Sequence, residues 1–68
     1  MRYTIDFFEI QEQTEVYRFS EDLEFNDLES CKFSVWEYLQ NSNVWKNCNM
    51  RIEITPKTKT TIYYYAQQ

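Results

Sequence analysis

The side chains of this sequence that could do chemistry are two thiols and a set of carboxylates. Cys31 and Cys48 are the two cysteines, eleven residues are acidic, and histidine is absent. Ser-His and Cys-His nucleophile pairs and His-ligated metal sites are therefore excluded. Glycine is also absent, which excludes the loops that let a backbone approach a phosphate closely. The remaining route to acid–base catalysis is a carboxylate, Tyr or Lys whose pKa is shifted by burial.

The thiols and carboxylates show no pattern of a catalytic or metal site. Lys32 follows Cys31, but adjacent residues of a helix point to different faces, so the lysine does not activate the thiol. The acidic run 21–24 lacks both the register and the glycine of a calcium-binding EF-hand loop. A chain this small also rarely encloses a ligand pocket of ~300 Å³ or more. We expect no enzyme activity, no cofactor and no bound metal.

Length and composition predict one small α+β domain over residues 1–68. A chain of this length buries a modest core, and its 13 aromatic residues are what compensates, because each removes about 150–250 Å² from water. The longest apolar run, 62–66, is far shorter than the roughly 18–20 residues that span a bilayer. With two cysteines and no secretory signal, we expect a cytoplasmic protein whose thiols are reduced.

Hydrophobic periodicity predicts four strands. Residues 2–10 and 14–19 are rich in β-branched and aromatic side chains, and the turn between them lacks Gly, which favours a loop longer than two residues. Met50, Ile52 and Ile54 alternate with polar residues as in a half-buried strand. After a turn over 56–59 that begins with proline, residues 60–65 form the last strand.

A helix is predicted between the two strand pairs, after a polar connection over 20–25. Asn26 is the expected N-cap, with Glu29 at the spacing of a capping box. The helix should end near residues 40–43. Apolar residues at alternating spacings of three and four then make one stripe: Leu28, Cys31, Val35, Tyr38 and Leu39. The order ββαββ favours a four-stranded, largely antiparallel sheet with the helix on one face.

One helix covers one face of a sheet, and the chain has more aromatic residues than that face can take. Strict alternation places Tyr17 and Phe19 on one side of their strand, while Phe33 lies opposite the helix stripe and Trp36 on its flank. An exposed apolar patch of this size indicates a partner surface, although a bulge in the first strand or an overlying segment would also cover it. The candidate partner-binding residues are Tyr17, Phe19, Phe33, Trp36, Tyr63 and Tyr65.

Charge is divided unevenly along the chain. Residues 1–30 hold two arginines against nine acidic residues, a net −7, whereas residues 31–68 carry a net +3. An acidic half suits docking on a basic surface, and it also keeps an aromatic-rich protein in solution. The residues expected to steer a partner electrostatically are Glu12, Glu15, Glu21, Asp22 and Glu24.

The sequence thus predicts a small non-catalytic protein-binding module with a regulatory or inhibitory role, with a homodimer through the aromatic face slightly favoured. Its composition, without Gly and rich in Asn, Lys, Ile and Tyr, is compatible with a phage or mobile-element gene. Two alternatives stay open. One is a purely self-associating structural module. The other, which the net charge of −4 opposes, is single-stranded nucleic-acid binding through Arg51, Lys57, Lys59, Tyr63 and Tyr65.

Overall fold

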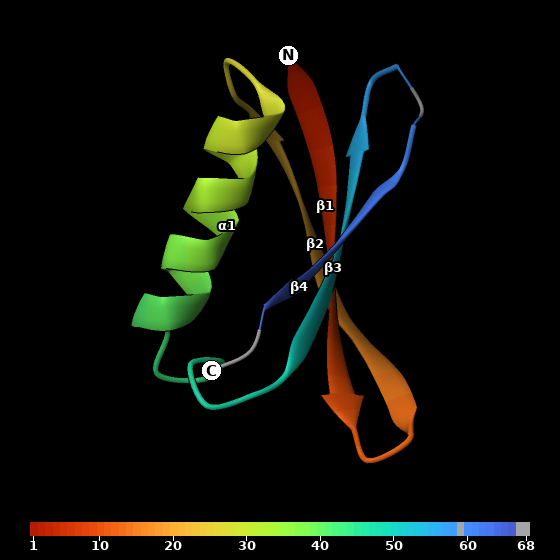
Figure 1. Cartoon of the computed structure of the whole chain (residues 1–68), viewed down its shortest axis with the longest axis vertical. Coiled ribbons are helices and arrows are strands. Elements are labelled where there is room, and N and C mark those ends of the chain that lie inside the picture. The colour runs from red at the N-terminus through yellow and green to blue at the C-terminus, as the bar shows by residue number, and fades with distance from the viewer. Residues whose placement is uncertain (59, 67–68) are drawn as a thin grey trace.

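The computed structural model describes residues 1–58 and 60–66. Within these residues the elements are β1 (Arg2–Gln11), β2 (Thr14–Glu24), α1 (Leu28–Asn41), β3 (Met50–Pro56) and β4 (Ile62–Ala66). The strands form one sheet in the order β2-β1-β3-β4, and each neighbouring pair is antiparallel. The helix α1 lies against one face of this sheet (Figure 1), which confirms the α+β fold and the ββαββ order expected from the sequence.

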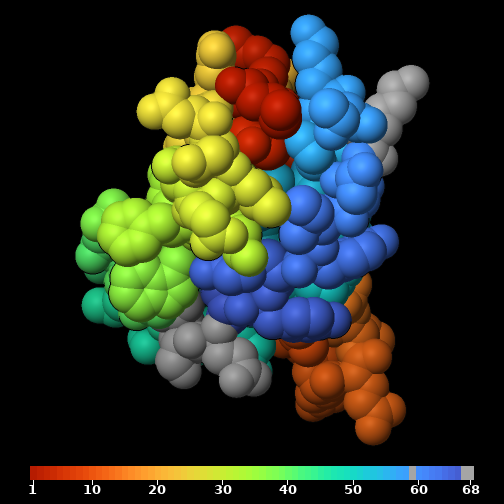
Figure 2. Space-filling model, turned by 45° about the horizontal axis from the view of Figure 1, so that its top comes forward, coloured from red at the N-terminus to blue at the C-terminus, as the bar shows by residue number. Residues whose placement is uncertain are grey.

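The core lies between α1 and the sheet. The register pairs Ile5 with Ile54 and Phe7 with Ile52. The odd-numbered residues of β1 and the even-numbered residues of β3 therefore face the helix. Figure 2 shows that β4, in dark blue, lies beside α1 at the surface. The alternate side chains of the strands and the apolar stripe of the helix therefore pack together in one buried cluster. Its members are Tyr3, Ile5, Phe7, Cys31, Val35, Leu39, Met50, Ile52, Ile54 and Ala66.

The helix begins one residue later than expected. Asp27 is the N-cap, and its carboxylate accepts a hydrogen bond of 2.8 Å from the backbone N–H of Ser30. That hydrogen bond lowers the pKa of Asp27. The N-cap assignment to Asn26 is therefore wrong; both residue types cap well, and the spacing alone does not choose between neighbours. Tyr38, expected in the buried stripe, is 48% exposed and touches Phe7 with its ring edge.

Residues 20–24 belong to β2, where the sequence predicted a polar connection. Their pairing with β1 continues to Arg2↔Glu24. The polar sequence is typical of an edge strand, because charged side chains there discourage pairing with other chains. At the other edge, β4 begins at Ile62, two residues later than expected. Pro56 pairs with Tyr3 as the last residue of β3, and it is not part of the turn.

A β-bulge in β2 changes which side chains face the helix. Phe7 pairs with Phe19 but Phe8 pairs with Tyr17, so Arg18 is an extra residue opposite this step. Because of it, Phe19 lies on the helix side, stacked on Phe7 at 4.3 Å, while Tyr17 lies on the other face. The expectation that Tyr17 and Phe19 share one side is wrong, and the bulge lies in the second strand rather than the first.

The β1–β2 turn has two residues, Glu12 and Gln13, because Gln11 pairs directly with Thr14. The expected longer loop is not formed. Glu12 adopts a φ of 56°, which supplies the positive φ that the first position of a type II′ turn requires. For a residue with a Cβ this conformation is costly, so the hairpin tolerates local strain at its tip.

We expect Glu12→Gly to raise the free energy of unfolding by about 0.5–1 kcal/mol, because Gly takes this φ without a Cβ clash. Urea denaturation followed by circular dichroism measures it. The control is Gln13→Gly, where φ is not positive and Gly should give no gain. Equal effects of the two variants would contradict strain at Glu12.

Candidate binding surface

The face of the sheet turned away from α1 has no helix over it (Figure 1), and three tyrosines stand on it. The register places Tyr17 opposite Phe8, Tyr63 opposite Glu53 and Tyr65 opposite Arg51, all on this face. Their exposed fractions are 56%, 61% and 63%. We call this surface, built from the outward side chains of β1–β4, the open face.

Arg51 of β3 lies at the centre of the open face. Its Nε donates a hydrogen bond of 2.7 Å to Glu15, and its Nη1 lies 3.0 Å from Glu53. The guanidinium carbon is 4.5 Å from the centre of the Phe8 ring and 5.2 Å from that of Tyr63. Since these partners come from β1, β2, β3 and β4, one side chain joins every strand of the described sheet.

The surroundings of Arg51 keep it charged and fixed. Its side chain is 11% exposed. The hydrogen bond to Glu15 raises the pKa of Arg51, and Glu53 adds to the effect. A guanidinium with two carboxylates and two ring faces has its charge compensated within the protein. The rings of Phe8 and Tyr63 thus contact a charge that is itself paired with two carboxylates.

Tyr17 is held by a second polar group on the same face. Its hydroxyl is 2.7 Å from the hydroxyl of Ser20, which in turn donates a hydrogen bond to Asp6. The ring meets Phe8 edge-on, with the centroids 5.6 Å apart. Because the ring of Phe8 also contacts the guanidinium of Arg51, the ring of Tyr17 is linked through Phe8 to Arg51.

The open face is acidic. Arg2 is a second cation on it, with Nη1 3.7 Å from Asp22 and Nη2 4.0 Å from Glu24. The two arginines face five carboxylates, a net charge of −3 over the described strand residues of this face. The carboxylates are those of Asp6, Glu15, Asp22, Glu24 and Glu53.

The other residues predicted for partner binding lie elsewhere. Phe19 packs into the core side of the sheet against Phe7, Tyr38 and Trp45, so its place on the exposed aromatic face is wrong. Phe33 and Trp36 are exposed on α1 with ring centroids 6.2 Å apart, on the opposite side of the molecule from the open face.

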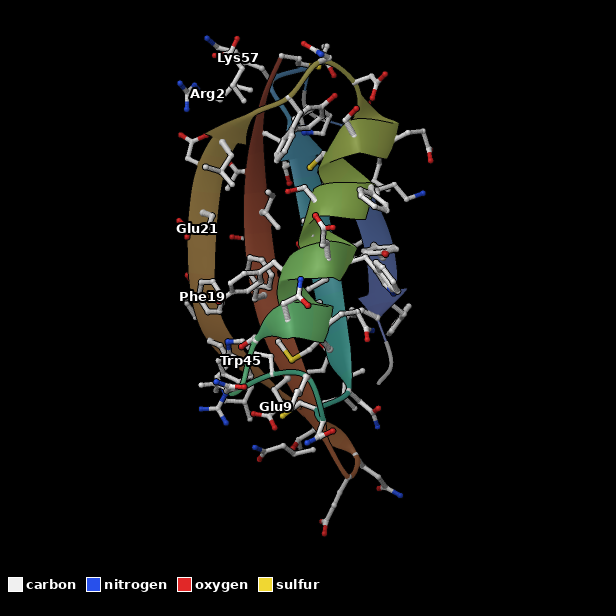
Figure 3. The ribbon with its side chains drawn as sticks, turned by 90° about the vertical axis from the view of Figure 1, so that its left-hand side faces the viewer. Arg2, Glu9, Phe19, Glu21, Trp45 and Lys57 are labelled. Atoms are coloured by element: carbon white, nitrogen blue, oxygen red, sulfur yellow. The ribbon has the colours of Figure 1, made fainter. Side chains whose placement is uncertain are left out.

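The predicted steering residues also separate. Glu15, Asp22 and Glu24 belong to the open face, whereas Glu12 lies at the tip of the β1–β2 turn. Glu21 points to the helix side, at the outer edge of β2 (Figure 3). Of the nine acidic residues in the N-terminal half, four lie on the open face, and the other five lie on the helix side, at the turn or at the start of α1.

Glu21 borders a shallow apolar cleft of about 160 Å³ between β2 and α1. A second cleft of about 240 Å³ lies beside Arg2 and Lys57, which meet at the same end of the sheet (Figure 3). Both are smaller than the ~300 Å³ or more of most small-molecule sites. The first is lined by Ile5, Phe7, Leu23, Phe25, Ser34, Val35 and Tyr38 in addition to Glu21.

A cluster at the bulge ties the segment after α1 to the sheet. Figure 3 shows Glu9 and Trp45 close together, with Phe19 above them. Arg18 donates a hydrogen bond of 2.7 Å to Glu9 and lies 5.9 Å from the Trp45 ring. The Arg18 hydrogen bond lowers the pKa of Glu9. Trp45 belongs to the connection between α1 and β3, and it stacks on Phe19 of β2 with the ring centroids 6.0 Å apart.

Neither thiol is activated. Burial raises the pKa of Cys31 to about 11, and burial together with Glu9 raises that of Cys48. Both cysteines are free and stay protonated at neutral pH. In residues 1–58 and 60–66 the structure contains no group of three or more Cys, Asp or Glu side chains that could hold a metal ion. No helix in these ranges is long and apolar enough to cross a membrane.

No known family model, curated protein or solved structure matches the chain. Sequence reasoning singled out the three tyrosines of the open face and named Arg51 only as a phosphate-binding cation, so it missed the contacts of Arg51 with rings and carboxylates of this face. The signal available in the sequence was Arg51 itself, a cation on the outward side of the alternating strand that contains Met50, Ile52 and Ile54.

We expect Arg51→Met to lower the free energy of unfolding by about 2 kcal/mol, since charged hydrogen bonds and ring contacts are lost and two carboxylates are left facing each other. The control is Arg2→Met, whose exposed, longer ion pairs should be worth less than about 0.5 kcal/mol. Urea denaturation of both variants gives the comparison. Similar losses would show that Arg51 has no special role.

The Glu9–Arg18 pair predicts a pH-dependent contribution to stability. Because the folded pKa of Glu9 lies below its ordinary value of 4.5, the pair stabilises fully well above pH 4.5 and less as the pH falls through the lowered pKa. The melting temperatures of wild type and Glu9→Gln should therefore differ at pH 7 and converge in acid. Glu37→Gln, exposed on α1, is the control. A difference that persists in acid would contradict the assignment.

Proposed function

We propose that the protein is a small non-catalytic binding module that docks another protein on its open face. The observation that carries the proposal is the presence of three tyrosines, each more than half exposed, on the face turned away from α1, with Arg51 against the ring of Tyr63. Tyrosine is enriched at the centres of protein interfaces, where its ring buries a large area with few rotatable bonds. Rings already held by the protein lose less conformational entropy on binding.

A regulatory or inhibitory role fits a module of this kind. The open face presents aromatic area and carboxylates, and both cysteines keep raised pKa values. A protein with these features acts on a partner by occupying its surface. The net charge of −3 on the same face favours a partner whose surface is basic.

The same charge counts against nucleic-acid binding and against self-association through the open face. The five carboxylates of the open face repel the phosphates of a nucleic acid, and two copies that met face to face would bring like charges together. Lys59, one of the cations expected to bind phosphate, lies outside the described residues. A basic protein is therefore the better partner for this face.

The test compares two double variants as baits for capture from the cells that express the protein. Tyr63→Ser/Tyr65→Ser removes two rings of the open face, and Phe33→Ser/Trp36→Ser removes two exposed rings of α1. We expect a nuclease-resistant protein partner whose recovery falls at least about tenfold with the first variant, because each of the two lost rings costs roughly 1 kcal/mol or more. The second variant should recover it as wild type does.

Circular dichroism first establishes that both variants are folded. Recovery unaffected by the tyrosine variant, or material that disappears after nuclease treatment, would contradict the proposal. Sedimentation of the purified protein is the companion measurement: a stable dimer abolished by the tyrosine variant would assign the open face to self-association instead.

A further inference from the structure

We infer that the partner segment bound by the open face is extended and arginine-rich, with its guanidinium groups stacked on Tyr63 and Tyr65. This inference rests on the proposed function and names the chemistry of the partner. It follows from three properties of the open face: how it already binds a guanidinium, what it leaves unoccupied, and the strand edge beside it.

The open face already holds one guanidinium, that of Arg51. The group lies between the rings of Phe8 and Tyr63, with carboxylates of Glu15 and Glu53 at hydrogen-bonding distance. Flat aromatic faces next to carboxylates are the arrangement that a guanidinium satisfies better than an ammonium, because it is planar, stacks and donates in a fork. Beyond Arg51, the open face carries the exposed ring of Tyr65 on β4, and its remaining carboxylates lie on β1 and β2.

Part of this binding capacity is unoccupied. Tyr63 and Tyr65 are each more than 60% exposed, so most of their ring surface faces solvent. Asp22 and Glu24 are exposed on β2, at the opposite edge of the sheet from β4, so they attract a cationic segment at long range without contacting it. The net charge of −3 over the described strand residues leaves the face short of cations. Added guanidiniums would supply the missing charge.

The position of β4 gives the segment its conformation. β4 is the last strand in the order β2-β1-β3-β4, so its outer backbone edge has no neighbouring strand in the described sheet. Figure 2 shows β4 at the surface. An extended peptide that pairs with such an edge places every second side chain on one face. Tyr63 and Tyr65 are themselves two residues apart, so arginines at alternate positions would lie in step with them.

The probe is an octapeptide with alternating Arg and Thr, titrated against the full chain at physiological salt by fluorescence anisotropy. Three peptides of matched length are compared with it: the block isomer with four Arg followed by four Thr, the Lys–Thr version and a Glu–Thr version. We expect the alternating arginine peptide to bind tightest, with the lysine peptide at least about threefold weaker. The glutamate peptide should not bind.

Two double variants separate stacking from bulk charge. Tyr63→Ser/Tyr65→Ser leaves the charge unchanged and should weaken binding about tenfold. Glu29→Gln/Glu37→Gln removes two charges from α1, and should weaken it less than about threefold. Equal binding by the tyrosine variant, or equal binding of the alternating, block and lysine peptides, would overturn the inference.

Competition tells a failure of this inference from a failure of the proposed function. A partner that is lost with the tyrosine variant and displaced by the alternating arginine peptide supports both. A partner lost with that variant but not displaced by the peptide leaves the open face as a docking site and overturns arginine recognition. A partner retained by the tyrosine variant contradicts the proposed function itself.

Discussion

The guanidinium of Arg51 is the interaction on which the open face depends. It lies on β3, yet it contacts a ring of β1, a carboxylate of β2 and a ring of β4. Glu15 is 36 residues away in the sequence and reaches Arg51 across the intervening strand β1. A cation that is 11% exposed needs this compensation, because an unpaired charge withdrawn from water is costly. The rings of Phe8 and Tyr63 pack against this charge, and the ring of Tyr17 packs in turn against Phe8.

The two faces of the sheet are stabilised by different means. The helix side is sealed by aliphatic and aromatic packing, while the open side is a layer of stacked rings and ion pairs. The bulge at Arg18 separates the two, because it sends Phe19 inward to Trp45 and leaves Tyr17 outside. The protein therefore keeps one aromatic surface for folding and presents another to solvent. This division leaves the rings of Tyr17, Tyr63 and Tyr65 exposed on the open face.

Local patterns in the sequence predicted most of the fold. The alternation of Met50, Ile52 and Ile54 and the helical stripe around Val35 are properties of neighbouring residues, and the elements follow from them. The length of β2 was missed because an edge strand tolerates polar side chains that resemble a loop. The bulge was missed because it depends on the register with β1. The strained turn at Glu12 exists because strand pairing on both sides outweighs its local cost.

The candidate site was predictable only in part for the same reason. A surplus of aromatic residues could be counted, and it indicated Tyr17, Tyr63 and Tyr65. The contacts of Arg51 could not be found this way, because three of its four partners come from other strands. Phe19 was assigned to the wrong face by alternation that the bulge interrupts.

The most direct test of the central role of Arg51 is the nitrogen-15 NMR spectrum of the arginine side chains at neutral pH. We expect the Nε–H proton of Arg51 to exchange slowly with water. Its chemical shift should be changed by the ring currents of Phe8 and Tyr63, and the change should be smaller in Tyr63→Ser. The exposed Arg2 gives the reference signal. An Arg51 signal that exchanges as fast as that of Arg2, at the frequency of an unstructured chain, would contradict the central role of Arg51.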